Sequence, residues 1–196
     1  MTDPTRSEAD ITGLLQAVRR GDPGALDALF PVVYEQLREL ARAQRRRWHG
    51  DPTMNATAIV HEAYLKLFGQ GAIASESRGH FFAVAARAMR HILCNYARDR
   101  QRLKRGGGVE HVPIEDRSGG MAIGVSDENA DELAALDEAL QRLEQTNARQ
   151  SRVVECRFFG GLSIEDTASA LGLSPATVKR DWTMARAWLY RELERR

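Results

Sequence analysis

The stretch from Gly161 to Leu193 constrains the fold most, because it contains two helix starts separated by one tight turn. Ser163 and Ser174 are placed to cap the first turns of two successive helices, and a proline follows the second serine at the first helical position. Gly172 lies between them, where a helix can end in the left-handed conformation at little cost. The stretch therefore predicts a helix-turn-helix unit.

The second helix of this unit has distinct inner and outer faces. Its inward stripe repeats at three- and four-residue steps and consists of Val178, Trp182, Ala185 and Leu189. The polar and basic residues at its start and on its outer flanks are Ser174, Thr177, Lys179, Arg180, Thr183 and Arg186. A helix-turn-helix offers such residues to the major groove of DNA, so these six are candidate contacts. An ordinary helical hairpin with a basic face is the alternative.

Helical periodicity also fills most of residues 22–105 and predicts an all-α fold. A first helix is expected to begin after an N-cap at Asp22 and to be interrupted by Pro31. Its apolar face consists of Leu26, Leu29, Phe30, Val33, Leu37, Leu40 and Ala41. A second helix covers residues 55–68, and a long basic amphipathic helix covers residues 80–105.

Residues 106–130 break this pattern. They contain six glycines, a proline and scattered acids, and no apolar face repeats among them. Such a composition predicts a flexible acidic linker. The chain would then consist of two small helical domains, at residues 10–105 and 131–194.

Charge is segregated into blocks that the net charge of +1 conceals. Residues 36–105 carry 14 Lys and Arg against 5 Asp and Glu, whereas residues 106–148 carry 2 against 10. A basic block favours a surface that binds a polyanion, because positive side chains release the counterions of phosphates. The alternative is a set of solvated helix faces.

The residues of a catalytic or metal site are missing from the sequence. The five histidines are dispersed, the two cysteines lie far apart, and no glycine-rich phosphate loop precedes a lysine. His61 and Glu62 resemble the start of a zinc motif, but Lys66 stands near the place of the second histidine. We expect no enzymatic activity, no cofactor and no metal. No apolar run approaches the roughly 20 residues of a membrane span, so we expect a cytoplasmic protein without membrane insertion.

Four segments together resemble the bacterial sigma-70 family, in its extracytoplasmic-function (ECF) group. They are "GDPGALDALF", "IVHEAYLKLF", the basic "ARDRQRLKR" and, after the linker, "RVVECRFFGGLSIEDTASALGLSPATVKRDWTMARAWL". The resemblance implies a promoter-melting helical bundle in the first domain and a helix-turn-helix domain in the second. It also implies core RNA polymerase and promoter DNA as partners, with an anti-sigma factor as a further candidate.

The same resemblance assigns roles to residues of the first domain. The long basic helix would face the minus 10 element through Arg87, Arg90, Asn95 and Arg98, and the loop from Gly69 to Gly79 would hold an extruded base. The helix-turn-helix would read the minus 35 element. Core polymerase would bind residues of the expected helix at 55–68, and these are Asn55, Ile59, Val60, Glu62, Tyr64 and Leu65.

This polymerase-binding segment departs from the family pattern. Many members begin the corresponding helix with several acids, whereas here "NATAIVHE" keeps only Glu62. Either the segment docks mainly through apolar side chains, or a Ser/Thr protein kinase restores the missing charge by phosphorylating Thr57 or, as a second choice, Thr53.

A different class of protein also fits the helix-turn-helix. A stand-alone transcriptional repressor or activator would use the same unit to bind duplex DNA without polymerase. Binding to DNA in the absence of core polymerase is the property that separates the two hypotheses.

Overall fold

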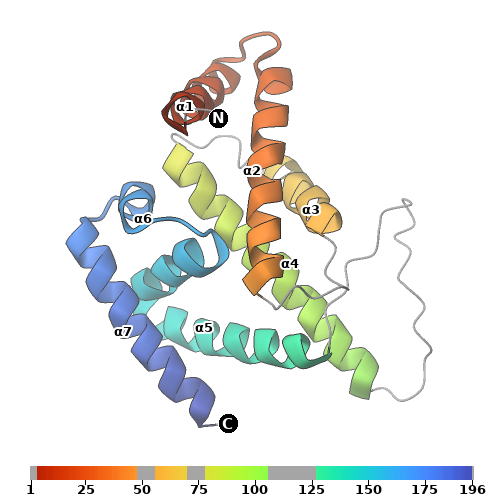
Figure 1. Ribbon diagram of the computed structural model, residues 1–196, viewed down its shortest axis with the longest axis vertical. Coiled ribbons are helices and arrows are strands. Elements are labelled where there is room, and N and C mark those ends of the chain that lie inside the picture. Colours follow the sequence, from red (N-terminus) through yellow and green to blue (C-terminus); the bar gives the residue numbers. More distant parts are fainter. Residues whose placement is uncertain (1–3, 48–55, 70–77, 106–126, 196) are drawn as a thin grey trace.

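The computed structural model describes residues 4–47, 56–69, 78–105 and 127–195 (Figure 1). These ranges contain seven α-helices and one short π-helix, and no strand. The predicted all-α fold is confirmed. The segment predicted as a linker lies almost wholly outside the described residues.

The first half of the chain forms four helices: α1 (Pro4–Arg20), α2 (Ala25–Arg47), α3 (Ala56–Gly69) and α4 (Arg78–Arg105). The predicted cap of α2 at Asp22 is wrong, because Gly21 and Gly24 adopt positive φ angles of 76° and 75° and the helix begins only after them. α2 then continues through Pro31 as a single helix.

The second half forms α5 (Asp127–Val154), the π-helix η2 (Glu155–Phe159), α6 (Ile164–Leu171) and α7 (Pro175–Glu194). α5 bends at Asn147, whose φ and ψ of −152° and 83° are not helical. The Asn147 side chain accepts a hydrogen bond from the Gln150 amide at 3.1 Å, as an N-cap does at the start of a new helix.

α4 lies in the middle of the molecule and contacts both halves (Figure 1). It packs against α1 and α3 of the first half and against α5, η2 and α6 of the second. A single cluster of buried side chains spans them, with Leu37, Ile59 and Met89 from the first half and Leu140 and Phe159 from the second. The division into two domains stays a prediction, while in this conformation the two halves share one core.

The backbone at Gly160, which directly follows η2, approaches its neighbours closely. A Cβ atom at this position would lie 2.7 Å from the Cys156 carbonyl oxygen and 2.8 Å from the Ala86 Cβ of α4. Real side chains do not approach so closely, so the second half can sit on α4 only because this residue has no side chain.

We therefore expect Gly160→Ala to reduce the free energy of unfolding by about 1–3 kcal/mol, the usual cost of forcing an extra carbon into a packed site. The φ of −85° at this residue suits alanine, so the loss would come from the contact and not from backbone strain. Urea unfolding, monitored by circular dichroism, measures this change in the free energy of unfolding.

Gly13→Ala is the matched control. Nothing lies within 4 Å of a Cβ atom at Gly13, which is in the interior of α1, so this change should stabilise the protein by about 0.5–1 kcal/mol. An equal stabilisation by both substitutions would contradict the close approach at Gly160.

Candidate nucleic-acid interface

The helix-turn-helix forms as the sequence predicts, from α6 and α7. Ser163 Oγ accepts a hydrogen bond from the Asp166 amide at 2.9 Å, and Ser174 Oγ accepts one from the Thr177 amide at 3.2 Å. Gly172 ends α6 with a φ of 64°, in the left-handed region. Each helix end is therefore specified by its own residues, which fixes the turn between the two helices.

The inner side of α7 holds this unit together. Val178 is fully buried and packs with Val153 of α5 and Ala168 of α6 in a small apolar cluster. Asp181 is also buried on α7 and accepts a hydrogen bond from Arg149 of α5 at 2.6 Å. Packing and an ion pair thus hold α7 on the other helices and leave its outer side free for other contacts.

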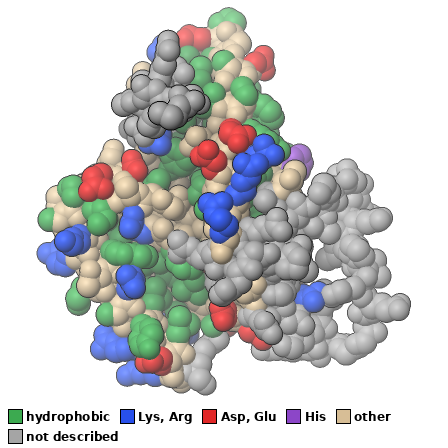
Figure 2. Space-filling view, in the orientation of Figure 1, with side chains coloured by type: hydrophobic (Ala, Val, Ile, Leu, Met, Phe, Trp, Pro, Cys, Tyr) green, Lys and Arg blue, Asp and Glu red, His purple; other side chains and the backbone are tan. Residues whose placement is uncertain are grey.

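The outer side of α7 carries the predicted polar and basic residues. The exposed ones are Lys179, Arg180, Thr183 and Arg186, and basic side chains gather along the edge formed by α7 (Figure 2). Ser174 is exposed but caps the helix, and Thr177 is half-buried. The Arg186 guanidinium lies over the Trp182 ring, with 5.7 Å to its centroid. This face can offer cations to phosphates and hydroxyls to base edges.

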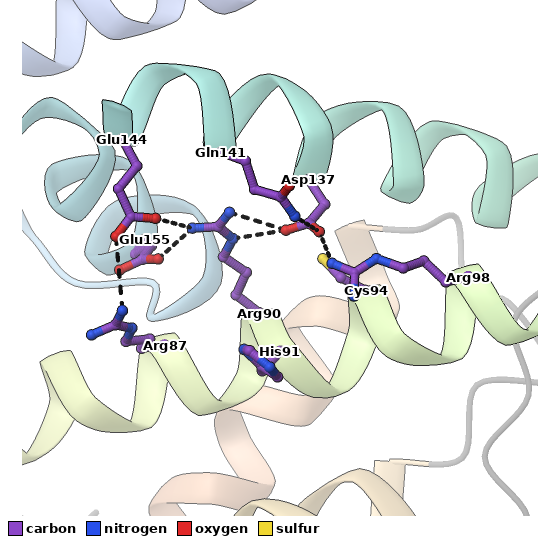
Figure 3. Close-up of a pocket in the computed structure, with 9 residues that line it drawn as sticks. All are labelled: Arg87, Arg90, His91, Cys94, Arg98, Asp137, Gln141, Glu144 and Glu155. Carbon is purple, nitrogen blue, oxygen red and sulfur yellow. Dashed lines mark hydrogen bonds and ion pairs between the residues drawn. The ribbon is translucent and has the colours of Figure 1, made fainter. Parts of the chain in front are cut away.

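The four predicted minus 10 residues lie along α4, and three of them, Arg87, Arg90 and Arg98, pair with acids of the second half (Figure 3). Arg90 is only 7% exposed, and its Nη1 lies 2.6 Å from Glu155 Oε1 while its Nε donates to Asp137 Oδ1 at 3.1 Å. Arg98 also pairs with Asp137 and donates to Asn95 Oδ1 at 3.1 Å.

Arg87 is the more accessible arginine of this group. Its Nη2 lies 3.8 Å from Glu144 Oε1, and both side chains are largely exposed. Such a surface pair is worth no more than about 1 kcal/mol. Arg87 could therefore exchange its carboxylate partner for a phosphate at little cost.

Burial and charge act in opposite directions on the Asp137 carboxyl. Burial alone would raise its pKa, but the hydrogen bond from Arg98 and the charges of Arg90 and Arg98 hold the pKa below its ordinary value. The Arg90 pKa is raised, because bonding to Glu155 and Asp137 outweighs burial. Asp137 is thus ionised at neutral pH. Its stabilising effect is complete above its unfolded pKa of about 3.9 and is lost as the pH falls through the folded value.

The predicted polymerase-binding residues on α3 divide into two sets. Ile59 and Val60 are completely buried in the shared core, so this conformation does not offer them to a partner. Leu65 is 55% exposed and Tyr64 is half-buried. Glu62 accepts a hydrogen bond from the Tyr96 hydroxyl at 2.9 Å.

Apolar surface beside α3 comes from α2. Phe30 is 42% exposed and Leu26 is 46% exposed, although the sequence pattern placed both on the inward face. The Phe30 ring packs edge-on against Tyr64, with centroids 4.8 Å apart. Phe30, Leu26, Tyr64 and Leu65 are called the apolar patch below.

Comparison with models of known protein families shows which family this chain belongs to. The family model described as ECF sigma factor matches residues 8–195. The chain belongs to the ECF sigma factor family. No curated protein and no solved structure gives a significant match to it.

Membership of this family makes the chain a sigma factor with a role in transcription initiation, as the sequence predicted. The helix-turn-helix and α4 both lie within the matched residues. In the described part of the chain, no helix is both long and apolar enough to cross a membrane. The same residues hold no group of three His, Cys, Asp or Glu side chains arranged to bind a metal ion.

Some predicted positions of this sigma factor cannot be placed. Asn55, Thr53 and residues 70–77 of the base-holding loop lie outside the described residues. The residues that sequence reasoning missed are the acids that face α4, namely Asp137, Glu144 and Glu155. The excess of acids in residues 106–148 was the only signal for Asp137 and Glu144, and it does not reveal which acid meets which arginine. Glu155 lies outside that block and had no such signal.

Proposed function

We propose that this sigma factor binds core RNA polymerase and directs it to promoter DNA in the cytoplasm, without chemistry of its own. The observation that carries the proposal is the exposed basic face of α7, held on a capped helix-turn-helix in a chain that matches the ECF family over residues 8–195. A bare basic helix could bind any polyanion, whereas this one is fixed in the arrangement that enters a major groove.

Two surfaces would each contact a different element of the promoter. The outer residues of α7 would read the minus 35 element, where phosphate contacts set the position and a few side chains read bases. Arg87, Arg90, Asn95 and Arg98 on α4 would contact the minus 10 element once it is single-stranded. Stacking and backbone contacts are the usual way to hold such a strand.

The apolar patch is the surface that we assign to core polymerase. It combines two exposed residues of α2 with Tyr64 and Leu65 of α3, and Glu62 lies on the same helix. Aromatic side chains that are partly buried yet exposed at one edge are typical of the centre of protein interfaces. Because ECF sigma factors are typically regulated by anti-sigma factors, such a factor would block transcription by covering this patch.

The first turn of α3 is a candidate site for regulation by phosphorylation. This turn contains no acidic residue, and the Thr57 side chain is exposed there. We propose Thr57 as the target of a Ser/Thr protein kinase. A phosphate brings about −1.5 to −2 charge and is favourable at a helix N-terminus, so it would supply the acidity that other family members encode.

Run-off transcription with purified core polymerase on genomic fragments tests the main proposal. We expect transcripts only when this protein is added. The double variant Lys179→Ala with Arg186→Ala should weaken the promoter complex by about 1–3 kcal/mol for each lost base contact, or flatten its salt dependence if the contacts are to phosphate. Arg191→Ala is the control, since this arginine is exposed on α7 beyond both positions, towards the end of the helix. Tight binding to duplex DNA without core polymerase would instead support a stand-alone repressor or activator.

The kinase hypothesis predicts an order of affinities for core polymerase. Thr57→Glu should bind more tightly than the unmodified chain, by about 0.3–1 kcal/mol or more, because one negative charge is placed at the start of α3. Thr57→Ala should bind no more tightly than the unmodified chain. His61→Glu places the same charge on an exposed position one turn later and serves as control. Equal affinities for all of these proteins would contradict the hypothesis.

A further inference from the structure

One cation on the outer side of α7 is paired with an aromatic ring instead of an acid. The Arg186 guanidinium carbon lies 5.7 Å from the centroid of the Trp182 ring, one turn earlier on the same helix. Residues at this spacing are neighbours on a helix surface. Arg186 is exposed, and among the residues that the structure describes no acid forms an ion pair with it.

The Trp182 ring is itself held by the elements that pack beneath α7. It is half-buried and packs against the small apolar cluster around Val178. The Arg157 guanidinium of η2 also lies over this ring, with 5.5 Å to its centroid, and donates a hydrogen bond to the Leu162 carbonyl oxygen. The ring therefore has a fixed position, on which Arg186 can rest.

A ring leaves the hydrogen-bonding groups of an arginine available. A guanidinium has five N–H donors, and an acid partner would occupy some of them. An aromatic ring attracts the positive charge through its π electrons instead, so the donors remain available to a second partner. Arg180, by contrast, lies 3.8 Å from the Asp181 carboxylate. Arg186 is thus both held in place and able to bind another acceptor.

The position of Arg186 along α7 indicates which acceptor it meets. Residues near the start of a recognition helix contact base edges in the major groove. Arg186 lies about three turns after Pro175, the first residue of α7, or roughly 16 Å along the helix axis. The groove is only about 12 Å wide. Arg186 should therefore reach the sugar–phosphate backbone beside the groove, where a guanidinium meets a phosphate.

We propose that Trp182 is a positioning residue, which holds Arg186 in place before DNA binds, so that the guanidinium meets a backbone phosphate beside the minus 35 element. The inference deepens the proposed function and rests on it, because it concerns the same face of α7. A long arginine side chain loses rotamer freedom when a ligand fixes it, and one that is already fixed loses less. The ring thus increases affinity without touching the DNA.

The phosphate contact is tested first, with Arg186→Ala in the holoenzyme formed with core polymerase. The change should weaken the complexes with promoters of different sequence by a similar factor, because a phosphate carries no sequence information. It should also reduce the log–log salt slope of binding by about 0.9, the value for one phosphate of duplex DNA. An unchanged slope with a relaxed preference for one base would overturn the assignment to phosphate.

The positioning role is tested by removing the ring with and without Arg186→Ala. Trp182→Leu alone should weaken the holoenzyme–promoter complex about two- to fivefold, which is the effect of one exposed cation–π contact. In the chain that carries Arg186→Ala, it should have no further effect. In the chain that carries Lys179→Ala, it should keep its full effect, because the described residues place no ring against Lys179.

A purely structural role of the ring gives a different result. If Trp182 only supports α7, Trp182→Leu weakens the complex by the same factor whether or not Arg186→Ala is present, and this result would overturn the inference. Trp182→Phe is the conservative variant. It keeps an aromatic face and should bind within about twofold of the unmodified chain.

A second measurement needs no substitution of Trp182 and uses the free chain. NMR relaxation of the arginine Nε–H groups reports how rigidly each side chain is held. The order parameter of Arg186 should exceed that of Arg152, which is exposed on α5 and has no ring contact among the described residues. Equal values for the two, both below about 0.6, would overturn the positioning role even if Trp182→Leu does not fold.

These experiments separate failure of the inference from failure of the proposed function. Absence of transcript from the unmodified chain with core polymerase would refute the sigma factor proposal, and with it the contact beside the minus 35 element. The order parameters would still show whether Trp182 holds Arg186. Normal transcription together with independent effects of Trp182→Leu and Arg186→Ala would overturn the inference alone.

Discussion

The burial of Arg90 is the constraint on which the arrangement of this molecule depends. A guanidinium can leave water only if its donors are satisfied and its charge is balanced, and here both carboxylates come from the other half of the chain. Loss of one partner from such a buried pair costs about 3–5 kcal/mol, mostly because the other charge is left behind. The main effect of the ion pairs of Arg90 with Asp137 and Glu155 is therefore to fix the position of α5 and η2 on α4. Their net contribution to the free energy of unfolding is small by comparison.

The segregation of charge along the sequence acquires a physical meaning from this contact. The basic block contains α4 and the acidic block contains most of α5, and the structure brings the two helices face to face. The same arginines can serve carboxylates within the chain or phosphates of a nucleic acid, but not both at once.

A feature could be predicted from the sequence when the residues that determine it lie close together along the chain. The helix-turn-helix was predicted down to its caps, because Ser163, Gly172 and Ser174 act on residues no more than four positions away. Burial of Asp137 could not be predicted, since it requires two arginines that lie 47 and 39 positions earlier in the chain. An acid on a charged helix ordinarily faces water.

The same reasoning explains why the burial of some residues on α2 and α3 differs from the prediction. The three- to four-residue spacing placed Phe30 inside, yet it lies at the shoulder of the apolar face and packs on Tyr64 while remaining exposed. Ile59 and Val60 were assigned to a partner, but the core shared with α4 covers them. Periodicity shows that a helix has an apolar side, and only tertiary packing decides where that side ends.

The radius of gyration of the free chain, measured by small-angle X-ray scattering, tests the central claim most directly. A compact chain of this length has a radius of about 16–17 Å. The account predicts a value close to this, with a single-peaked distance distribution, for the protein without polymerase. A radius above about 22 Å, with a second peak from separated halves, would contradict it.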